Sequence, residues 1–264
     1  MDIIALIASP QTCHDSLRAA LAAAEVDRDA AITALHVRFD PTKIALSAEE
    51  IDVQELRLKD EGTAEQPGET RAIFDNWAKS LGDRGKAVAW REVEGDSVGT
   101  LVRNAGLITI SRPQSMEARD ALHAAVFDHQ RLVLFVPPLP QSAPIVIGAS
   151  IAIAWNDDAQ VRHCLTKAEP WLRAAGMVHV LSPSEEYFDS AIALLAESGV
   201  TPVTHVIESH QDDLGTQLLE KVHRLGADCL LMGAYRHGEF LQTIFGGVTR
   251  TVMDKTDLPI FFCH

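Results

Sequence analysis

The residues of this chain with the clearest chemical potential lie in one loop, from Gly233 to Arg250. The loop reads Gly-Ala-Tyr-Arg-His-Gly-Glu-Phe-Leu-Gln-Thr-Ile-Phe-Gly-Gly-Val-Thr-Arg, and its glycine pair, Gly246 and Gly247, opens an expected helix. Glycine lets a backbone approach a ligand closely, and the amides and dipole of a helix N-terminus suit a phosphate group. Thr249 adds a hydroxyl. The pattern indicates a phosphate-binding loop; the alternative is a helix start that needs small residues for packing.

Two side chains in the loop add polar groups. Arg236 offers a guanidinium, which binds phosphate through paired hydrogen bonds. His237 beside it is the histidine best placed to face a ligand. Both are therefore candidate ligand-binding residues.

The elements that must position this loop are strands alternating with helices, in the same order in each half of the chain. Such alternation predicts parallel sheets with right-handed crossovers. Pro137-Pro138-Leu139-Pro140 separates the halves. We expect two tandem α/β domains, 1–140 and 141–264, each an open five-stranded, mainly parallel sheet with flanking helices. The expected strands are 3–8, 31–37, 87–93, 107–111 and 132–136, then 150–155, 178–181, 203–207, 229–232 and 259–263.

Helix boundaries follow from capping residues and glycines. Thr12 or Asp15 is expected to cap the alanine-rich helix of the first half. A single helix is expected over 158–174, closed by Gly176 as a left-handed C′ glycine. The polar segment 45–68 is expected to be an insertion, either a lid or a solvated loop.

Composition limits the partners and the compartment. The net charge of −14 disfavours nonspecific binding to nucleic acid or an anionic membrane. No apolar run approaches the roughly 18 residues of a membrane span, and no secretory signal is evident, so a cytoplasmic protein is expected. The four cysteines are scattered without a C-x-x-C pair, and no metal site is expected. Trp155 and Trp171 are expected to be core or interface aromatics.

The loop, with the following Thr251-Val-Met-Asp-Lys-Thr-Asp-Leu-Pro-Ile, resembles the C-terminal signature of universal stress proteins. Nucleotide-binding members of that family bind the phosphates and ribose of ATP through G-x-x-G, nine residues, then G-S/T. Ile151-Ala-Ile-Ala-Trp-Asn-Asp-Asp matches the first strand and its turn, and Val178-His-Val-Leu matches the strand beside the adenine. The resemblance implies an adenine nucleotide, with or without Mg²⁺, bound in the second half. The implied site residues are Ala154, Asn156, Leu181, Gly233, Arg236, His237, Gly246, Gly247, Val248 and Thr249.

Three positions depart from the family pattern. Asn156 stands where the family often has Asp, Arg236 replaces the second glycine, and Gly247 replaces the Ser/Thr. The first half departs further, because its corresponding loop, Ser111 to Met116, has no glycine, and Pro113 supplies no amide. We expect that this half keeps the fold and has lost the site.

The resemblance also implies how the halves pack. The family pairs its last strands antiparallel, so 132–136 and 258–262 should pair and form an intramolecular pseudo-dimer, which covers both edges. Whether two chains form a further homodimer, and which proteins bind to the chain, are left as open questions.

Three functions follow as hypotheses. The first is a regulatory, non-catalytic stress-response protein that binds ATP or another adenine nucleotide. The second is a nucleotide-free scaffold for protein partners, which Arg236 favours. The third is an enzyme of the wider adenine nucleotide hydrolase-like fold, which only the shared topology supports.

Overall fold

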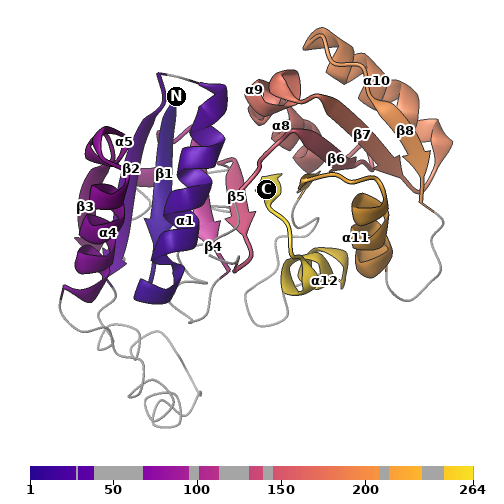
Figure 1. Ribbon diagram of the computed structural model, residues 1–264. Coiled ribbons are helices and arrows are strands. Elements are labelled where there is room, and N and C mark those ends of the chain that lie inside the picture. Colours follow the sequence, from indigo (N-terminus) through magenta and orange to yellow (C-terminus); the bar gives the residue numbers. More distant parts are fainter. Residues whose placement is uncertain are drawn as a thin grey trace, which may run out of the picture.

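The apolar runs of the sequence form the strands of one large sheet in a computed structural model of the chain (Figure 1). The structure describes residues 1–27, 29–38, 68–94, 101–112, 131–138, 145–207, 214–233 and 247–263. The expected insertion at 45–68 and the expected helix at 116–128 lie outside these residues, apart from Gly68. In the described part of the chain, no helix is both long and apolar enough to cross a membrane.

The first half supplies five strands. Its elements are β1 (Asp2–Ile7), α1 (Pro10–Ala23), η1 (Ala24–Val26), β2 (Ala31–Arg38), α4 (Glu69–Ser80), α5 (Asp83–Lys86), β3 (Ala89–Glu94), β4 (Leu107–Ser111) and β5 (Val133–Val136). The strands β4 and β5 are buried along their whole length, as expected of central strands with both faces covered.

The second half supplies the other five. Its elements are β6 (Ser150–Ala154), α8 (Ala159–Lys167), α9 (Glu169–Ala174), β7 (Met177–Ser182), η4 (Glu185–Tyr187), α10 (Phe188–Glu197), β8 (Val203–Val206), α11 (Leu214–Arg224), β9 (Cys229–Gly233), α12 (Gly247–Lys255) and β10 (Ile260–Cys263).

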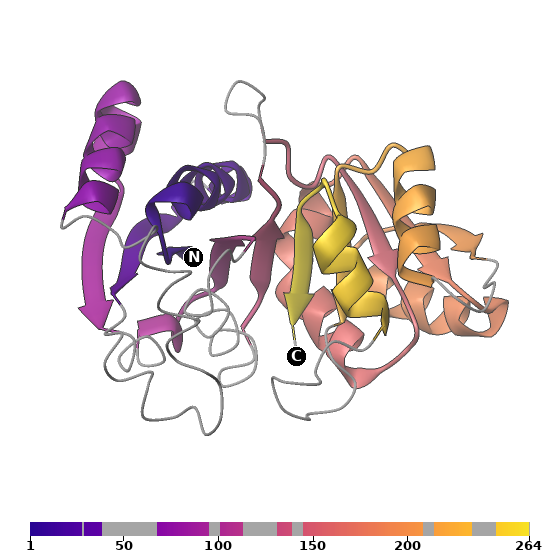
Figure 2. The same ribbon diagram turned by 90° about the horizontal axis from the view of Figure 1, so that it is seen from below.

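The sheet has ten strands in the order β3-β2-β1-β4-β5-β10-β9-β6-β7-β8. The α/β class and the mainly parallel pairing are confirmed, but the two separate sheets that we expected are the halves of a single one. They join because β5 and β10 pair antiparallel, which confirms the predicted pairing of the last strands. Figure 2 shows β5 and β10 side by side at the middle of the molecule.

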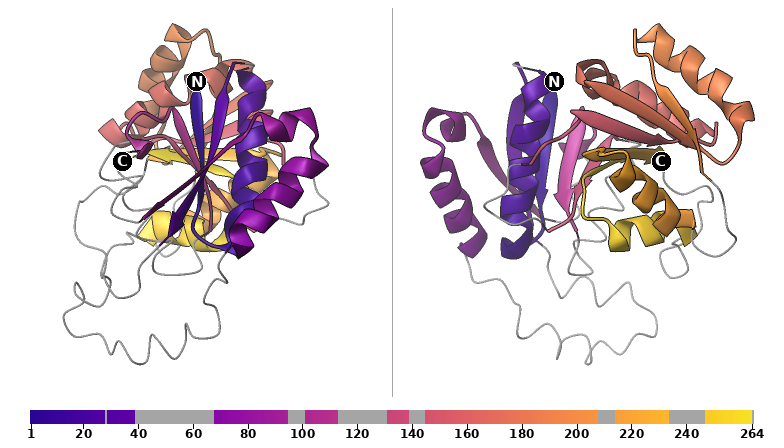
Figure 3. Two further views of the ribbon diagram at one scale, coloured as in Figure 1. Left: turned by 90° about the vertical axis from the view of Figure 1, so that its left-hand side faces the viewer. Right: turned by 45° about the vertical axis from the view of Figure 1, so that its right-hand side comes forward.

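The register shows that the halves are related by an approximate twofold axis. Phe261 pairs with Leu134, while Ile260 pairs with Phe135 and Phe262 with Val133. Counting outward from that central pair, each half repeats the same strand order. Seen along the sheet, the strands fan out with a continuous twist (Figure 3, left).

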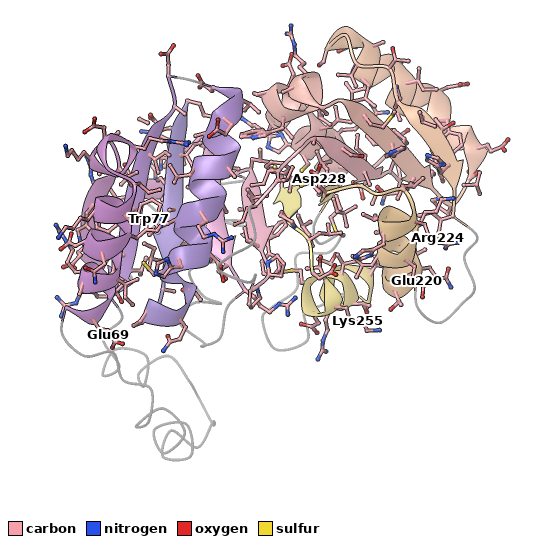
Figure 4. All side chains as sticks on the ribbon, in the orientation of Figure 1. Glu69, Trp77, Glu220, Arg224, Asp228 and Lys255 are labelled. Carbon is pink, nitrogen blue, oxygen red and sulfur yellow. The ribbon has the colours of Figure 1, made fainter. Side chains whose placement is uncertain are left out.

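Helices cover both faces of the sheet. The helices α1, α4, α8, α9 and α10 contribute to one apolar core, and α11 and α12 contribute to the other. Lys255 at the end of α12 donates to the Thr216 hydroxyl of α11 at 2.7 Å (Figure 4). The Asp228 carboxylate, also labelled there, accepts from the amides of Gly148 and Ser150 at 2.7 and 2.8 Å, so it ties the start of β6 to β9.

Two side chains link the halves outside the sheet. The buried Trp171 indole donates to the Ala23 carbonyl at 3.0 Å, and its ring lies 5.0 Å from that of Phe261. Arg112 donates through Nη2 to the Thr256 carbonyl at 2.7 Å. The expectation for Trp171 as an interface aromatic is confirmed.

Several helix boundaries differ from the expectation. The first helix begins after Ser9, not at Thr12 or Asp15, because Pro10 starts it with the fixed φ that suits a first turn. The helix expected over 158–174 is two helices, α8 and α9, and Pro170 lies in the first turn of the second. Gly176 has no left-handed φ, so it is not a C′ glycine of that kind; Gly199 and Gly226 have φ of +73° and +67°.

Candidate functional site

The candidate site lies where the strand order of the second half reverses. From β6 the chain goes to β7 on one side and later reaches β9 on the other, so the carboxyl ends of β6 and β9 flank a topological switch point. Ligands of open parallel sheets bind at this place. Ala154 ends β6, Gly233 ends β9, and Leu181 lies beside Ala154 on β7.

The close approach of helix α8 explains why Gly233 is a glycine. A Cβ on Gly233 would lie 2.9 Å from the Val161 amide nitrogen and 3.1 Å from Gln160 Cβ. Its φ is not left-handed, so space and not backbone conformation excludes a side chain. The sequence indicated that Gly233 lets a ligand approach the backbone. In the structure, Gly233 lets helix α8 pack closely against the end of β9.

The turn after β6 forms a network of its own. Asp158 is the N-cap of α8, and its carboxylate accepts from the Val161 amide at 2.9 Å and from Asn156 Nδ2 at 2.7 Å. An Asp at position 156 would set a second carboxylate against Asp158. The Asn in place of the family's Asp therefore fits this chain's cap.

Asp157 and Arg162 complete the turn. Asp157 has a left-handed φ of +61°, which Asp tolerates better than most residues. Its carboxylate forms an ion pair with Arg162, whose guanidinium also lies 5.5 Å from the centre of the Trp155 ring. Trp155 is buried, as expected of a core aromatic, and its indole donates to the Tyr187 carbonyl at 3.0 Å.

Two of the helices that begin at this edge of the sheet, α8 and α12, follow the strands β6 and β9 that flank the switch point. The α8 N-terminus is already capped by Asp158. The first turn of α12 begins with Gly247, Val248 and Thr249 and carries no acidic side chain. The positive end of its dipole is therefore not compensated by its own first turn, which makes α12 the better partner for an anion.

The structure places seven of the ten predicted site residues. The strand pairings bring Ala154, Leu181 and Gly233 together at one edge of the second half. Asn156 lies in the turn after β6, and Gly247, Val248 and Thr249 form the first turn of α12. Arg236, His237 and Gly246 lie outside the described residues. Asp157, Asp158 and Arg162 were not predicted as site residues, although the run Trp-Asn-Asp-Asp directly after a strand was the signal for them.

Comparison with solved structures identifies the fold of this chain. No protein-family model matches the chain, and no curated protein matches it. A universal stress protein structure from Archaeoglobus fulgidus DSM 4304 matches with a TM-score of 0.65 at 14% identity, covering 99% of this chain and 95% of its own. A universal stress protein structure from Pseudomonas aeruginosa UCBPP-PA14 matches with a TM-score of 0.57 at 14% identity, covering 99% and 92%.

This chain has the universal stress protein fold. A structure of a universal stress protein from Archaeoglobus fulgidus in complex with dAMP aligns with 43% of this chain and 94% of its own at 16% identity and a TM-score of 0.34. At these identities the likeness describes the arrangement of the chain, not its ligand.

The first half of this universal stress protein fold has the same switch point, between β1 and β4, with different residues. Ser111 occupies the position that Gly233 holds in the second half. Its amide donates to the Ser16 hydroxyl at 3.0 Å, and Ser16 is fully buried. The amide at the end of β4 is therefore used within the protein. The expected loop from Ser111 to Met116 lies outside the described residues beyond Arg112.

Proposed function

We propose that this chain is a tandem universal stress protein whose second half binds an adenine nucleotide, ATP or a close analogue. The observation that supports this proposal is that Ala154 and Gly233 lie at the ends of the paired strands β6 and β9 at the switch point, while Val248 at the start of α12 packs against the same apolar core as Ala154. In this proposal the phosphates bind at the first amides of α12, near Thr249, and the base lies toward Leu181 on β7.

We further propose a regulatory role, without catalysis. Among the described residues near the site, the carboxylates of Asp157 and Asp158 engage Arg162, Asn156 and the Val161 amide. These contacts give both carboxylates a structural role at the start of α8, whereas a general base must lie within hydrogen-bond reach of the proton that it removes. The nucleotide would then act by changing which partners the protein binds.

The first half is proposed to have the fold without the site. Its Ser111 amide is bonded to Ser16, and Pro10, which lacks an N–H, begins the helix that faces the switch point. One nucleotide per chain is therefore expected.

One alternative keeps the fold and removes the ligand. Arg236 stands where the nucleotide-binding pattern has its second glycine. If its side chain fills the phosphate position, the protein is a nucleotide-free scaffold whose surfaces bind other proteins.

Two measurements distinguish these functions. The purified protein is denatured and its supernatant analysed by HPLC for adenine nucleotide, and the thermal unfolding of the protein is followed with and without ATP and Mg²⁺. We expect one bound nucleotide per chain, or a stabilisation that reaches ~2.7 kcal/mol when free ATP is 100 times the dissociation constant. Thr249→Val should weaken this effect.

The Arg236→Gly variant supplies the control. If the wild-type chain neither carries nucleotide nor is stabilised by it, while Arg236→Gly gains both, the scaffold function is supported and Arg236 is the block. If neither protein responds, the proposed site is wrong.

A further inference from the structure

Two histidines face each other on the outer strands of the second half. The Nδ1 of His179 on β7 lies 3.1 Å from the Nε2 of His205 on β8. His179 is opposite Val203 and Leu181 is opposite His205 in the register, so both imidazoles project from the same face of the sheet. The backbone ladder between the two strands fixes their separation.

The pair is reachable from solvent. His179 is 8% exposed and His205 is half-buried. Two neighbours on the same face, Met177 and Val203, are each 45% exposed. In the part of the chain that the structure describes, this face of β7 and β8 is therefore partly exposed beside the pair.

Both imidazoles favour the neutral form. Burial lowers the pKa of His179, and burial together with the charges of His179 and Lys221 lowers the pKa of His205. In the absence of an ion, one ring N–H donates to the other ring's lone pair. The acceptor ring already carries its proton on its outer nitrogen. When the donor ring takes its other tautomer, its proton also lies on the outer nitrogen, and the two facing nitrogens present lone pairs to the same point with no net loss of protons.

The geometry matches a pair of metal ligands. Two neighbouring nitrogens bound to one ion at about 2.0–2.1 Å are ~2.8–2.9 Å apart in a tetragonal arrangement and ~3.3 Å apart in a tetrahedral one, and the 3.1 Å between His179 and His205 lies between these values. Imidazole nitrogen suits divalent first-row transition metals, and Cu²⁺ heads their order of affinity.

We propose that His179 and His205 form a two-histidine site for a divalent transition metal ion, with Cu²⁺ preferred over Zn²⁺. Among the residues that the structure describes, no three or more His, Cys, Asp or Glu side chains come together to hold a metal. The protein therefore supplies two ligands, and water completes the coordination. The nearby ammonium of Lys221 repels the ion and weakens binding.

The test is a titration of the full chain, freed of metal by a chelator, with Cu²⁺ and with Zn²⁺. We expect an electron paramagnetic resonance spectrum of the Cu²⁺ complex with two coordinated nitrogens. His179→Gln and His205→Gln should each weaken this site by at least about tenfold. Lys221→Met should strengthen it, which a purely structural hydrogen bond between the histidines does not predict.

His163→Gln on α8 is the matched control for the loss of an imidazole elsewhere, and it should leave the site unchanged. Circular dichroism shows whether each variant folds, and the spectrum of the wild-type chain tests the site without any variant. Fewer than two nitrogens in that spectrum, or unchanged binding in a folded His205→Gln chain, overturns the proposal. Neither outcome bears on nucleotide binding, because the two sites share no residue.

Discussion

At the residue scale, Gly233 shows how packing limits what a site can contain. A Cβ at this position would lie 2.9 Å from the Val161 nitrogen, a backbone atom that cannot swing away. Gly233→Ala should therefore lower the free energy of unfolding by about 1–3 kcal/mol, the usual cost of forcing an extra group into a packed region.

Gly176→Ala is the matched control for Gly233→Ala. Its Cβ would meet only the Ala149 carbonyl, at 3.4 Å, and its φ is not left-handed. We expect a change within about 0.5 kcal/mol, measured for both variants by urea unfolding. Equal effects of the two substitutions would contradict the packing role of Gly233.

We also expect the free energy of unfolding to depend on pH, because two histidines have shifted pKa values. Burial lowers the pKa of both His179 and His205 below the ordinary 6.5, so the unfolded chain binds more protons as pH falls through that value. Their contribution to stability is then present above pH ~6.5 and lost below it. Lys221 faces His205 and adds to the effect.

His223 acts in the opposite direction. Burial lowers its pKa, but bonds to the Leu219 carbonyl and Asp257 outweigh burial and raise it. Its contribution is present below pH ~6.5 and is lost as pH rises through the folded-state value. Urea unfolding of metal-free protein between pH 5 and 7 should show a flatter profile for His205→Gln than for wild type, and a steeper acid loss for His223→Gln. Coincident profiles of all three would refute this assignment.

Some of these residue-level features can be predicted from the sequence and others cannot. The positions of Ala154 and Gly233 near strand ends could be predicted from the apolar runs to within one residue, because the expected strands 150–155 and 229–232 end beside them; their choice as site residues came from the family resemblance. The His179–His205 contact could not, because it depends on the register of two strands whose histidines are 26 positions apart.

At the element scale, the link between α9 and α1 carries a prediction. The Trp171 indole is buried and donates to the Ala23 carbonyl at the end of α1. Trp171→Phe removes the donor and leaves that carbonyl unsatisfied, which should cost about 1–3 kcal/mol. Chemical unfolding measures the loss; an unchanged midpoint would show that the two helices are held by the sheet alone.

Element boundaries were the least predictable part of the fold. The succession of strands and helices along the chain followed from the apolar runs, and the pairing of the last strands followed from the family resemblance. The sequence predicted one continuous helix over 158–174, so the division between α8 and α9 was missed. Pro170 lies in the first turn of the second helix, α9. The N-cap of the first helix was missed because Pro10 was not weighed against Thr12 and Asp15.

At the scale of the whole molecule, the antiparallel pairing of β5 and β10 holds the halves together. Each strand covers the other's open edge, and Leu134 and Phe261 meet at the approximate twofold axis. A chain of residues 141–264 alone would leave β10 uncovered. We expect it to form a homodimer through β10 with Phe261 opposite Phe261, since an open apolar edge pairs readily.

Light scattering after size-exclusion chromatography measures this state, and the same experiment tests the proposed boundary at residue 140. Phe261→Lys should convert the dimer into monomer, because it places like charges against each other at the axis. A stable monomer of the unmodified half would contradict the prediction.

The proposed nucleotide site is tested most directly by titrating the isotope-labelled full chain with ATP and Mg²⁺ and following the backbone amide resonances. We expect saturable shifts of the Gly233, Val248 and Thr249 amide resonances, at one nucleotide per chain, and no shift of the Ser111 amide. No shift at these amides, or shifts centred on Ser111 in the first half, would contradict it.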